Sequence, residues 1–169
     1  LKAGYTFMLG HPGKKLLFMG QDFGQCHEWD EKVALDWQLT DDEDHRDLQH
    51  YVRDLLQLYR KYPALYQLDN GFMWVNANDG DRRIFSFIRR DETGRKSLLF
   101  VINFTPVARP DYRVGVPKKG KYTRLLDSEH GAYKASEAQS YVSAKGECDG
   151  QPYSFAYPLP GYGTAIFRF

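Results

Sequence analysis

The stretch "RRIFSFIRRDETGRKSLLFVINF", residues 82–104, carries the clearest structural signal in the chain. Segments 83–90 and 97–104 are rich in apolar and aromatic residues at their centres, and a cluster of turn-forming residues at 91–94 separates them. Two runs rich in β-branched and aromatic residues on either side of such a cluster predict two neighbouring β-strands.

The same pattern continues along the rest of the chain, with further turn clusters at 78–81 and 117–120. Many short strands separated by turns at this spacing are typical of an antiparallel β-sandwich. We therefore predict an all-β sandwich domain over residues 70–169. The further strands that we expect are 72–76, 112–116, 122–127, 139–143, 153–157 and 164–169.

Upstream of residue 70 the pattern is helical, with one strand. Residues 1–11 predict the end of a helix, and the continuous apolar run 15–19 predicts a strand covered on both faces, as in parallel sheets. A second helix is expected to begin with a capping box of Thr40 and Glu43, and Pro63 then prevents its continuation. Its buried stripe is formed by Leu48, Val52, Leu55 and Tyr59.

Composition limits the possible function. The chain has 169 residues, 42% of them hydrophobic and 27% charged, with a net charge of +1. This balance gives no field that would attract nucleic acid or an anionic membrane, and no apolar run approaches the ~20 residues of a spanning helix. The N-terminus lacks a signal-peptide pattern, so we expect a cytoplasmic protein. Cys26 and Cys148 match no metal-ligand spacing, and we expect reduced thiols, no metal and no cofactor.

The candidate site follows the predicted strand 15–19. Asp22 lies in the tight loop 20–24 at the strand's end, and active sites of α/β barrels lie at the carboxyl ends of strands. Gln25 follows it, and Trp29 and Trp37 on the same rim would offer stacking faces to a sugar. The alternative is structural: Asp22 caps the turn through its own backbone, and both tryptophans pack the loop.

Two longer stretches carry a family resemblance: "HPGKKLLFMGQDFGQCHEWDEKVALDW" at 11–37 and "LLFVINFTPVARPDYRVGVPKKGKY" at 98–122. Their order and spacing resemble the C-terminal part of bacterial 1,4-α-glucan (glycogen) branching enzymes of the α-amylase superfamily. Asp22 stands where the family usually has Glu. The segments "DSEHGAYKAS" and "LPGYG", at 127–136 and 159–163, also depart from the family pattern.

The resemblance implies an α+β arrangement. Residues 1–69 would be the last strand and helices of an incomplete eight-stranded β/α barrel, and residues 70–169 an antiparallel sandwich. The family makes α-1,6 branches by retaining transglycosylation, which needs two carboxyl groups about 5–5.5 Å apart. The family's reacting acids lie on earlier barrel strands, so we expect no catalytic residue and no activity in this chain. Asp22, Gln25, Trp29 and Trp37 would shape the substrate rim.

Expected partners are an α-1,4-glucan, through the longer enzyme, and the rest of the barrel; nucleic acid and membranes are not expected. The unpaired strand 15–19 would leave residues 1–39 packed on the sandwich, associated with a second copy, or disordered. Two other functions are open: a related debranching or hydrolytic amylase, or a stand-alone glucan-binding sandwich. The stacking residues of such a sandwich would be Tyr122, Tyr133, Tyr141, Tyr153 and Tyr162.

Overall fold

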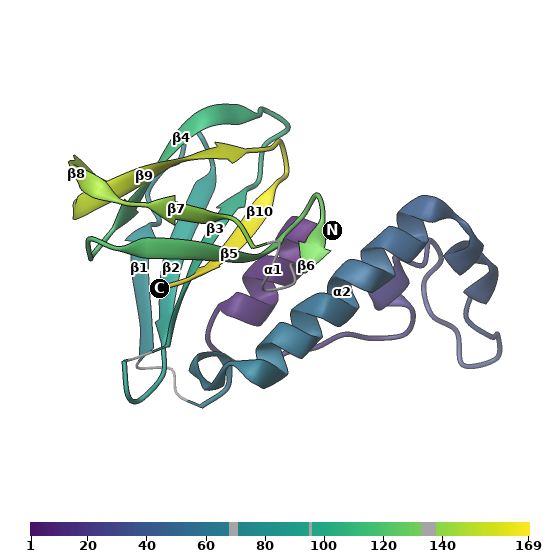
Figure 1. Ribbon diagram of the computed structural model, residues 1–169. Helices are drawn as coiled ribbons and strands as arrows, with labels where there is room; N and C mark the ends of the chain where they lie inside the picture. Colours follow the sequence, from purple (N-terminus) through teal and green to yellow (C-terminus); the bar gives the residue numbers. More distant parts are fainter. Residues whose placement is uncertain (68–70, 95, 133–137) are drawn as a thin grey trace.

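The computed structural model describes residues 1–67, 71–94, 96–132 and 138–169 and shows two layers of β-strands with helices on one side (Figure 1). The strands of the described residues form two sheets, and the strand pairs are antiparallel. This arrangement confirms the predicted sandwich.

The larger sheet has the order β1-β2-β3-β10-β5-β6, and β7 also pairs with β5. The strands of this sheet are β1 Phe72–Asn76, β2 Ile84–Arg90, β3 Ser97–Asn103, β5 Lys121–Asp127, β6 Gly131–Ala132, β7 Ser140–Val142 and β10 Thr164–Arg168. The smaller sheet has the order β4-β9-β8. Its strands are β4 Arg109–Val116, β8 Ala144–Cys148 and β9 Gln151–Leu159.

Strand β3 is buried on both faces, which explains its continuous apolar sequence. Leu99 and Val101 face the smaller sheet and join Val114 of β4 in the cluster between the sheets. Phe100 points to the opposite face and packs in a second cluster with Leu55 of the long helix. The larger sheet is therefore the middle of three layers.

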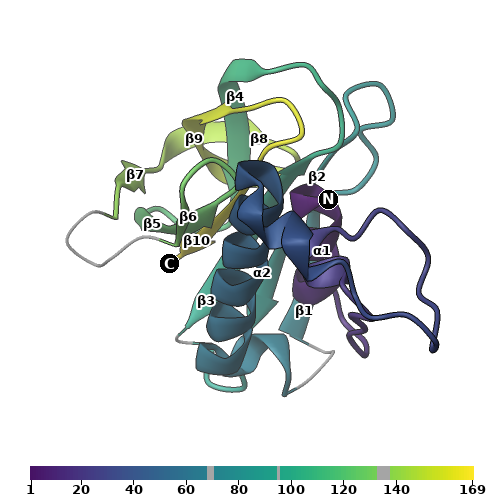
Figure 2. The same cartoon turned by 90° about the vertical axis from the view of Figure 1, so that its right-hand side faces the viewer.

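The outer layer consists of α1 (Lys2–Gly10) and α2 (Glu43–Lys61), which lie side by side on the larger sheet (Figure 2). Helix α1 contacts β3 and β10, so residues 2–10 pack on the sandwich, one of the three expected outcomes for residues 1–39. The predicted stripe of α2 is buried, except that Tyr59 is only partly covered. The buried residues of α2 are Leu48, Tyr51, Val52, Leu55 and Leu58.

The start of α2 differs from the predicted capping box. Asp42 is the N-cap and accepts a hydrogen bond from the Asp44 backbone N–H at 2.9 Å. The Thr40 hydroxyl instead donates to the Trp37 carbonyl at 2.7 Å, inside the short 3-10 helix Trp37–Asp41. The prediction of Thr40 as the cap is wrong because the acidic run offers a better-placed carboxylate two residues later. The end of α2 at Lys61, before Pro63, is as expected.

The predicted strand at 15–19 is wrong for this chain. Residues 14–18 belong to no helix and no strand, and Leu16, Phe18 and Met19 are 72%, 41% and 48% exposed. A strand needs a neighbour to pair its backbone groups, and no described strand lies beside this segment. Its apolar residues therefore stand at the surface. Among the described residues no helix is long and apolar enough to span a bilayer.

Candidate functional site

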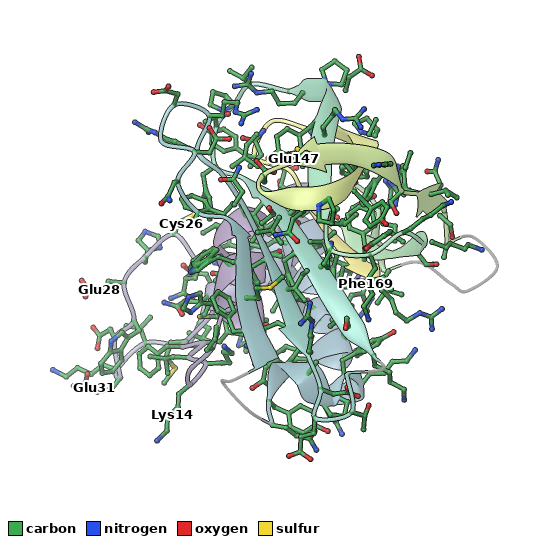
Figure 3. All side chains as sticks on the ribbon, turned by 90° about the vertical axis from the view of Figure 1, so that its left-hand side faces the viewer. Lys14, Cys26, Glu28, Glu31, Glu147 and Phe169 are labelled. Carbon is green, nitrogen blue, oxygen red and sulfur yellow. The ribbon has the colours of Figure 1, made fainter. Side chains whose placement is uncertain are left out.

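The first candidate region is the segment 20–42, which we call the rim loop. It extends beyond the N-terminal end of α2, away from the sandwich (Figure 1). Figure 3 shows the side chains of Glu28 and Glu31 projecting outward from it, with Lys14 just before it. The loop is thus an exposed surface feature rather than part of the sandwich core.

A tight turn holds Asp22 at the start of the rim loop. The 3-10 helix Gln21–Phe23 lies between Gly20 and Gly24, which have φ values of 78° and 72° and therefore left-handed conformations that favour glycine. The turn buries Phe23 completely and leaves Asp22 half-buried. Within the part of the chain that the structure describes, the Asp22 carboxylate accepts one long hydrogen bond, from the Gln49 side chain of α2 at 3.5 Å. It retains acceptor capacity at the surface.

The two tryptophans of the rim loop each pack one side on a phenylalanine. Trp37 lies on Phe23 with ring centroids 5.2 Å apart and remains 57% exposed. Trp29 meets Phe18 edge-on at 5.3 Å and remains 45% exposed. The contact through Phe23 brings Trp37 next to the turn of Asp22, whereas Trp29 contacts Phe18, which precedes the loop.

Gln25 connects the two ends of the rim loop. Its side-chain oxygen accepts from the Asp36 backbone N–H at 3.0 Å, and its side-chain nitrogen donates to the His27 carbonyl at 3.3 Å. The hydrogen bond from His27 lowers the pKa of Asp36. Both polar atoms of the Gln25 side chain thus form hydrogen bonds within the loop, so Gln25 stabilises the shape of the loop.

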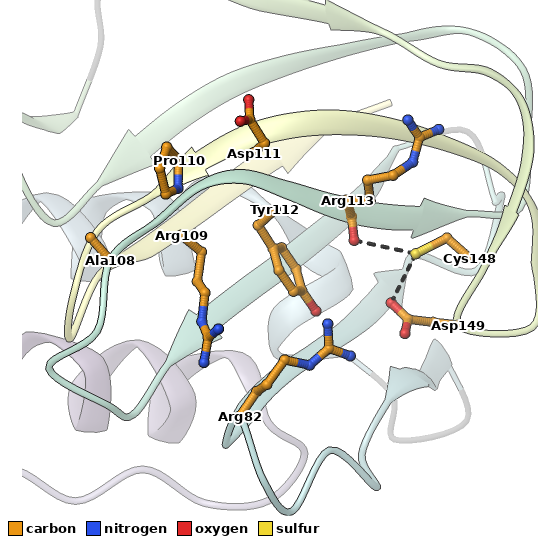
Figure 4. Close-up of a pocket in the computed structure, with 9 residues that line it drawn as sticks. All are labelled: Arg82, Ala108, Arg109, Pro110, Asp111, Tyr112, Arg113, Cys148 and Asp149. Carbon is orange, nitrogen blue, oxygen red and sulfur yellow. Dashed lines mark hydrogen bonds between the residues drawn. The ribbon is translucent and has the colours of Figure 1, made fainter.

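A second candidate region, which the sequence did not indicate, is a cleft of about 540 Å³ in the sandwich (Figure 4). It lies beside the first half of β4, with Arg82 and the turn between β8 and β9 on its other side. Figure 4 shows the side chains of Arg82, Arg109 and Tyr112 pointing toward one another, with Asp149 close to them. We call this the β4 cleft.

Two of the charged side chains at the β4 cleft, Arg82 and Asp149, have polar partners. Arg82 Nε pairs with the Asp79 carboxylate at 2.7 Å, which raises the pKa of the guanidinium, and Arg82 also lies over the Tyr112 ring. The Asp149 carboxylate accepts from the Asn76 side chain at 3.2 Å, and burial raises its pKa. Burial, more than the Asp149 charge, raises the pKa of Tyr112 to about 12, so this phenol stays protonated at neutral pH.

The β4 cleft offers hydrogen-bonding groups but no catalytic pair. Burial and the neighbouring Asp149 carboxylate raise the pKa of the Cys148 thiol to about 11, so it is not a thiolate nucleophile at neutral pH. Two carboxyl residues line the cleft, and Figure 4 shows Asp111 on the side of β4 opposite to Asp149. Asp79, which shares the Asn76 amide with Asp149, is held by Arg82 and does not line it. The region is therefore suited to binding.

The tyrosines proposed for a sugar-binding sandwich are mostly unavailable for stacking. Tyr122 is fully buried, Tyr141 and Tyr153 pack against the cluster between the sheets, and Tyr133 lies outside the described residues. Tyr162 is 58% exposed and borders a separate hollow of about 620 Å³ next to α1. In the part of the chain that the structure describes, no group of three or more potential metal ligands lies together.

Comparison with known proteins identifies the family of this fold. The sequence model of the protein family "Alpha amylase, C-terminal all-beta domain" matches residues 74–169 of the chain. The 1,4-alpha-glucan branching enzyme GlgB of Butyrivibrio fibrisolvens is 49% identical over the whole chain, which spans 27% of that protein. The corresponding enzyme of Gloeobacter violaceus is 42% identical over 99% of the chain and 24% of its own length.

Solved structures agree on the fold. An inactive double mutant of MUTB superposes with a TM-score of 0.62 at 14% identity, over 99% of this chain and 38% of that one. The chain spans about a quarter of the length of the two curated relatives. With its sandwich matched by the family model over residues 74–169, the chain belongs to the family of α-amylase C-terminal all-β domains.

Proposed function

We propose that the chain is the C-terminal part of a cytoplasmic 1,4-α-glucan branching enzyme that forms α-1,6 branches in glycogen. The observation that carries this proposal is the 49% identity to a protein of that name, which extends over the whole chain and so includes the rim loop as well as the sandwich. Membership of the sandwich in the family of α-amylase C-terminal domains would, by itself, also be compatible with a debranching or hydrolytic amylase. The branching enzymes among the relatives favour the first activity.

In this proposal the reacting carboxyl groups belong to the remainder of the longer protein. A barrel of this type needs about 250 residues, and retention needs two carboxyl groups about 5–5.5 Å apart. Asp42 of the rim loop caps α2, Asp22 accepts from Gln49, and Asp149 of the β4 cleft accepts from Asn76. We infer that residues 1–69 complete the barrel and that residues 70–169 support it from outside.

The rim loop is proposed to form one edge of the glucan site. Trp29 and Trp37 each keep an exposed aromatic surface, which can cover the apolar face of a glucosyl unit. Asp22, next to Trp37 through Phe23, keeps acceptor capacity for a sugar hydroxyl. Gln25 would hold the loop in the shape that presents these groups.

The exposed apolar segment 16–19 is proposed to be covered by the remainder of the barrel. Leu16, Phe18 and Met19 stand at the surface, with Trp29 against Phe18. Exposed clusters of large apolar side chains are typical of interaction surfaces. In the chain alone, the same surface would promote association with a second copy.

A chimera tests the proposed activity. The 169 residues would replace the region to which they align in the Butyrivibrio fibrisolvens enzyme, and branching of amylose would be followed by the fall in iodine staining. We expect the chimera to branch amylose and the 169-residue chain alone to leave staining unchanged. As a control, the Butyrivibrio fibrisolvens enzyme that lacks the aligned region shows whether branching requires a C-terminal part at all.

Two results would contradict the proposal: branching by the 169-residue chain alone, or a folded chimera without branching activity. Trp37→Ala in the chimera tests the rim. If Trp37 contacts the glucan, Trp37→Ala raises the KM for amylose several-fold. Val107→Ala, at an exposed position of the sandwich, leaves the KM unchanged and is the control.

A further inference from the structure

The β4 cleft owes its shape to a β-bulge in β4. Arg109 pairs with Leu159 of β9, and Tyr112 pairs with Tyr157, so three steps along β4 match two steps along β9. In a regular strand, residues three apart face opposite sides. The extra residue turns Arg109 to the same side as Tyr112, and bulges often redirect side chains in this way at functional sites.

The groups that the bulge brings together have unused hydrogen-bonding capacity. Arg109 Nε is buried and has no hydrogen-bond partner in the described structure, and no ion pair of its guanidinium is found there. The Tyr112 hydroxyl lies near the Asn76 side chain but makes no hydrogen bond of normal geometry. Buried polar atoms nearly always have a hydrogen-bond partner, and leaving one without a partner is destabilising.

The opposite wall of the cleft supplies an acceptor. Asp149 adopts a left-handed conformation, with φ of 53°, in the turn between β8 and β9, and this places its carboxylate near Tyr112. Gly115 of β4 lets this turn approach closely, since a Cβ there would collide with the Cys148 carbonyl. Donors on β4 therefore face an acceptor on the β8–β9 turn.

The balance of charge indicates the class of ligand. Arg82 is already paired with Asp79, and the carboxylates of Asp149 and Asp111 also line or flank the cleft. Arg109 and Arg113 line it as well, so the three arginines are balanced by the carboxylates of Asp79, Asp111 and Asp149, and the cleft has no excess of positive charge to favour an anion. Sugar hydroxyls both donate and accept hydrogen bonds, so they suit a mixed set of donors and acceptors with little net charge. The volume lies within the range of about 300–1,000 Å³ typical of small-molecule sites.

We propose that the β4 cleft is a second binding site for a short α-1,4-glucan segment, separate from the rim loop. Arg109 Nε and the Tyr112 hydroxyl donate to hydroxyl groups of the sugar, and the Asp149 carboxylate accepts from them. The identity of the sugar rests on the proposed function. In this arrangement the sandwich holds a glucan chain by hydrogen bonds rather than by ring stacking, because the Tyr112 ring is 5% exposed and covered by Arg82.

Titration of the ¹⁵N-labelled 169-residue chain with maltoheptaose tests the site by NMR. We expect saturable shifts of the Arg109 Nε–H signal and of the backbone amides of Cys148 and Asp149. Tyr112→Phe keeps the ring and should weaken this binding about three- to tenfold, as expected for one lost hydrogen bond. Arg109→Gln should weaken it at least as much, and Arg60→Gln on the exposed side of α2 is the charge-matched control.

The outcomes separate this inference from the proposed function. Shifts at the Trp37 indole without shifts at Arg109 would overturn the cleft site and leave the branching proposal intact. Saturable shifts at Arg109 with inorganic phosphate but not with maltoheptaose, at constant ionic strength, would show an anion site and also overturn it. An unchanged affinity of Tyr112→Phe and Arg109→Gln for maltoheptaose would show that these two side chains do not contact the sugar, and would overturn the proposed site. The chimera's branching activity decides the proposed function independently of all three results.

Discussion

Arg89, near the end of β2, donates a hydrogen bond from Nη1 to the Gly10 carbonyl at the end of α1, at a distance of 3.0 Å. Arg89 is 1% exposed, so this contact lies inside the interface between the helices and the larger sheet. The last carbonyls of a helix lack partners within the helix and carry partial negative charge. A cation from the sheet therefore fastens α1 to the sandwich.

Replacing Arg89 with Met should loosen this attachment. The change keeps an unbranched side chain but leaves the Gly10 carbonyl without its charged donor, so we expect the free energy of unfolding to fall by about 1.5–3 kcal/mol. Urea denaturation measures the effect, with Arg168→Met, at an exposed position of β10, as the control. Equal stability of the two variants would show that the contact contributes nothing.

Two glycines of α1 make a matched pair. A Cβ at Gly10 would lie 2.7 Å from the Phe100 ring and 2.9 Å from the Phe87 ring, and these rings are stacked with each other. A Cβ at Gly4 would meet nothing within 4 Å. Gly10→Ala should destabilise the chain by about 1–3 kcal/mol through overpacking. Gly4→Ala should stabilise it by about 0.5–1 kcal/mol, because alanine favours the helix.

Thermal or urea unfolding of both variants gives the comparison. A destabilised Gly4→Ala would mean that α1 is not a helix in solution, and a neutral Gly10→Ala would mean that the helix does not lie this close to the sheet. A loss of stability in Gly10→Ala together with a gain in Gly4→Ala would separate the effect of packing from the effect of helix propensity.

Alkaline pH should unfold the chain through its buried tyrosines. Burial raises the pKa of Tyr51, Tyr122 and Tyr157 to about 12, against an ordinary value of 10.0. In the unfolded chain these phenols lose their protons near pH 10, whereas in the folded chain they keep them until about pH 12. The folded state therefore binds more protons in this window, and its stability falls as pH rises from about 10 to 12.

Tyr51→Phe provides the test for one of these groups. The Tyr51 hydroxyl links α1, α2 and β10 through the hydroxyls of Thr6 at 2.6 Å and Thr164 at 2.8 Å. The variant should lose about 1–2 kcal/mol at pH 8 but show a smaller further loss up to pH 12. Urea midpoints at pH 8, 10 and 11 measure both effects, with exposed Tyr66→Phe as control. A flat pH profile for the unaltered chain would contradict the argument.

Sequence patterns predicted most of the sandwich but not all of its strands. The strands found by their apolar content were β1, β2, β3, β4, β5, β7, β9 and β10. Two strands were missed. β6 has only two residues, and β8, with the sequence "AKGEC", is a mostly exposed edge strand with no apolar alternation. The opposite error occurred at 15–19, where an apolar run predicts a strand but pairing requires a neighbour that the described chain does not supply.

The candidate sites were predictable to different degrees. Asp22 and Trp37 could be found because a glycine turn and aromatic residues after an apolar run are visible in the sequence. The engagement of Gln25 inside the loop depends on the backbone of Asp36, eleven residues away, which no local pattern shows. Arg109 and Tyr112 were missed because residues three apart face opposite sides of a regular strand, and the bulge that unites them becomes visible only through pairing with β9.

Exposed apolar residues around the rim loop should make the 169-residue chain associate with itself. Leu16, Phe18, Met19 and Val33 are between 41% and 72% exposed, and such surfaces tend to be buried by contact. We expect sedimentation velocity to show a concentration-dependent rise from monomer to dimer, and the double change Leu16→Asp and Phe18→Asp to abolish it. Val142→Asp places a charge on β7, at a residue that is 72% exposed, and is the control. A chain that stays monomeric at every concentration would contradict the prediction, and so would an equal effect of Val142→Asp, which would place the contact on the sandwich.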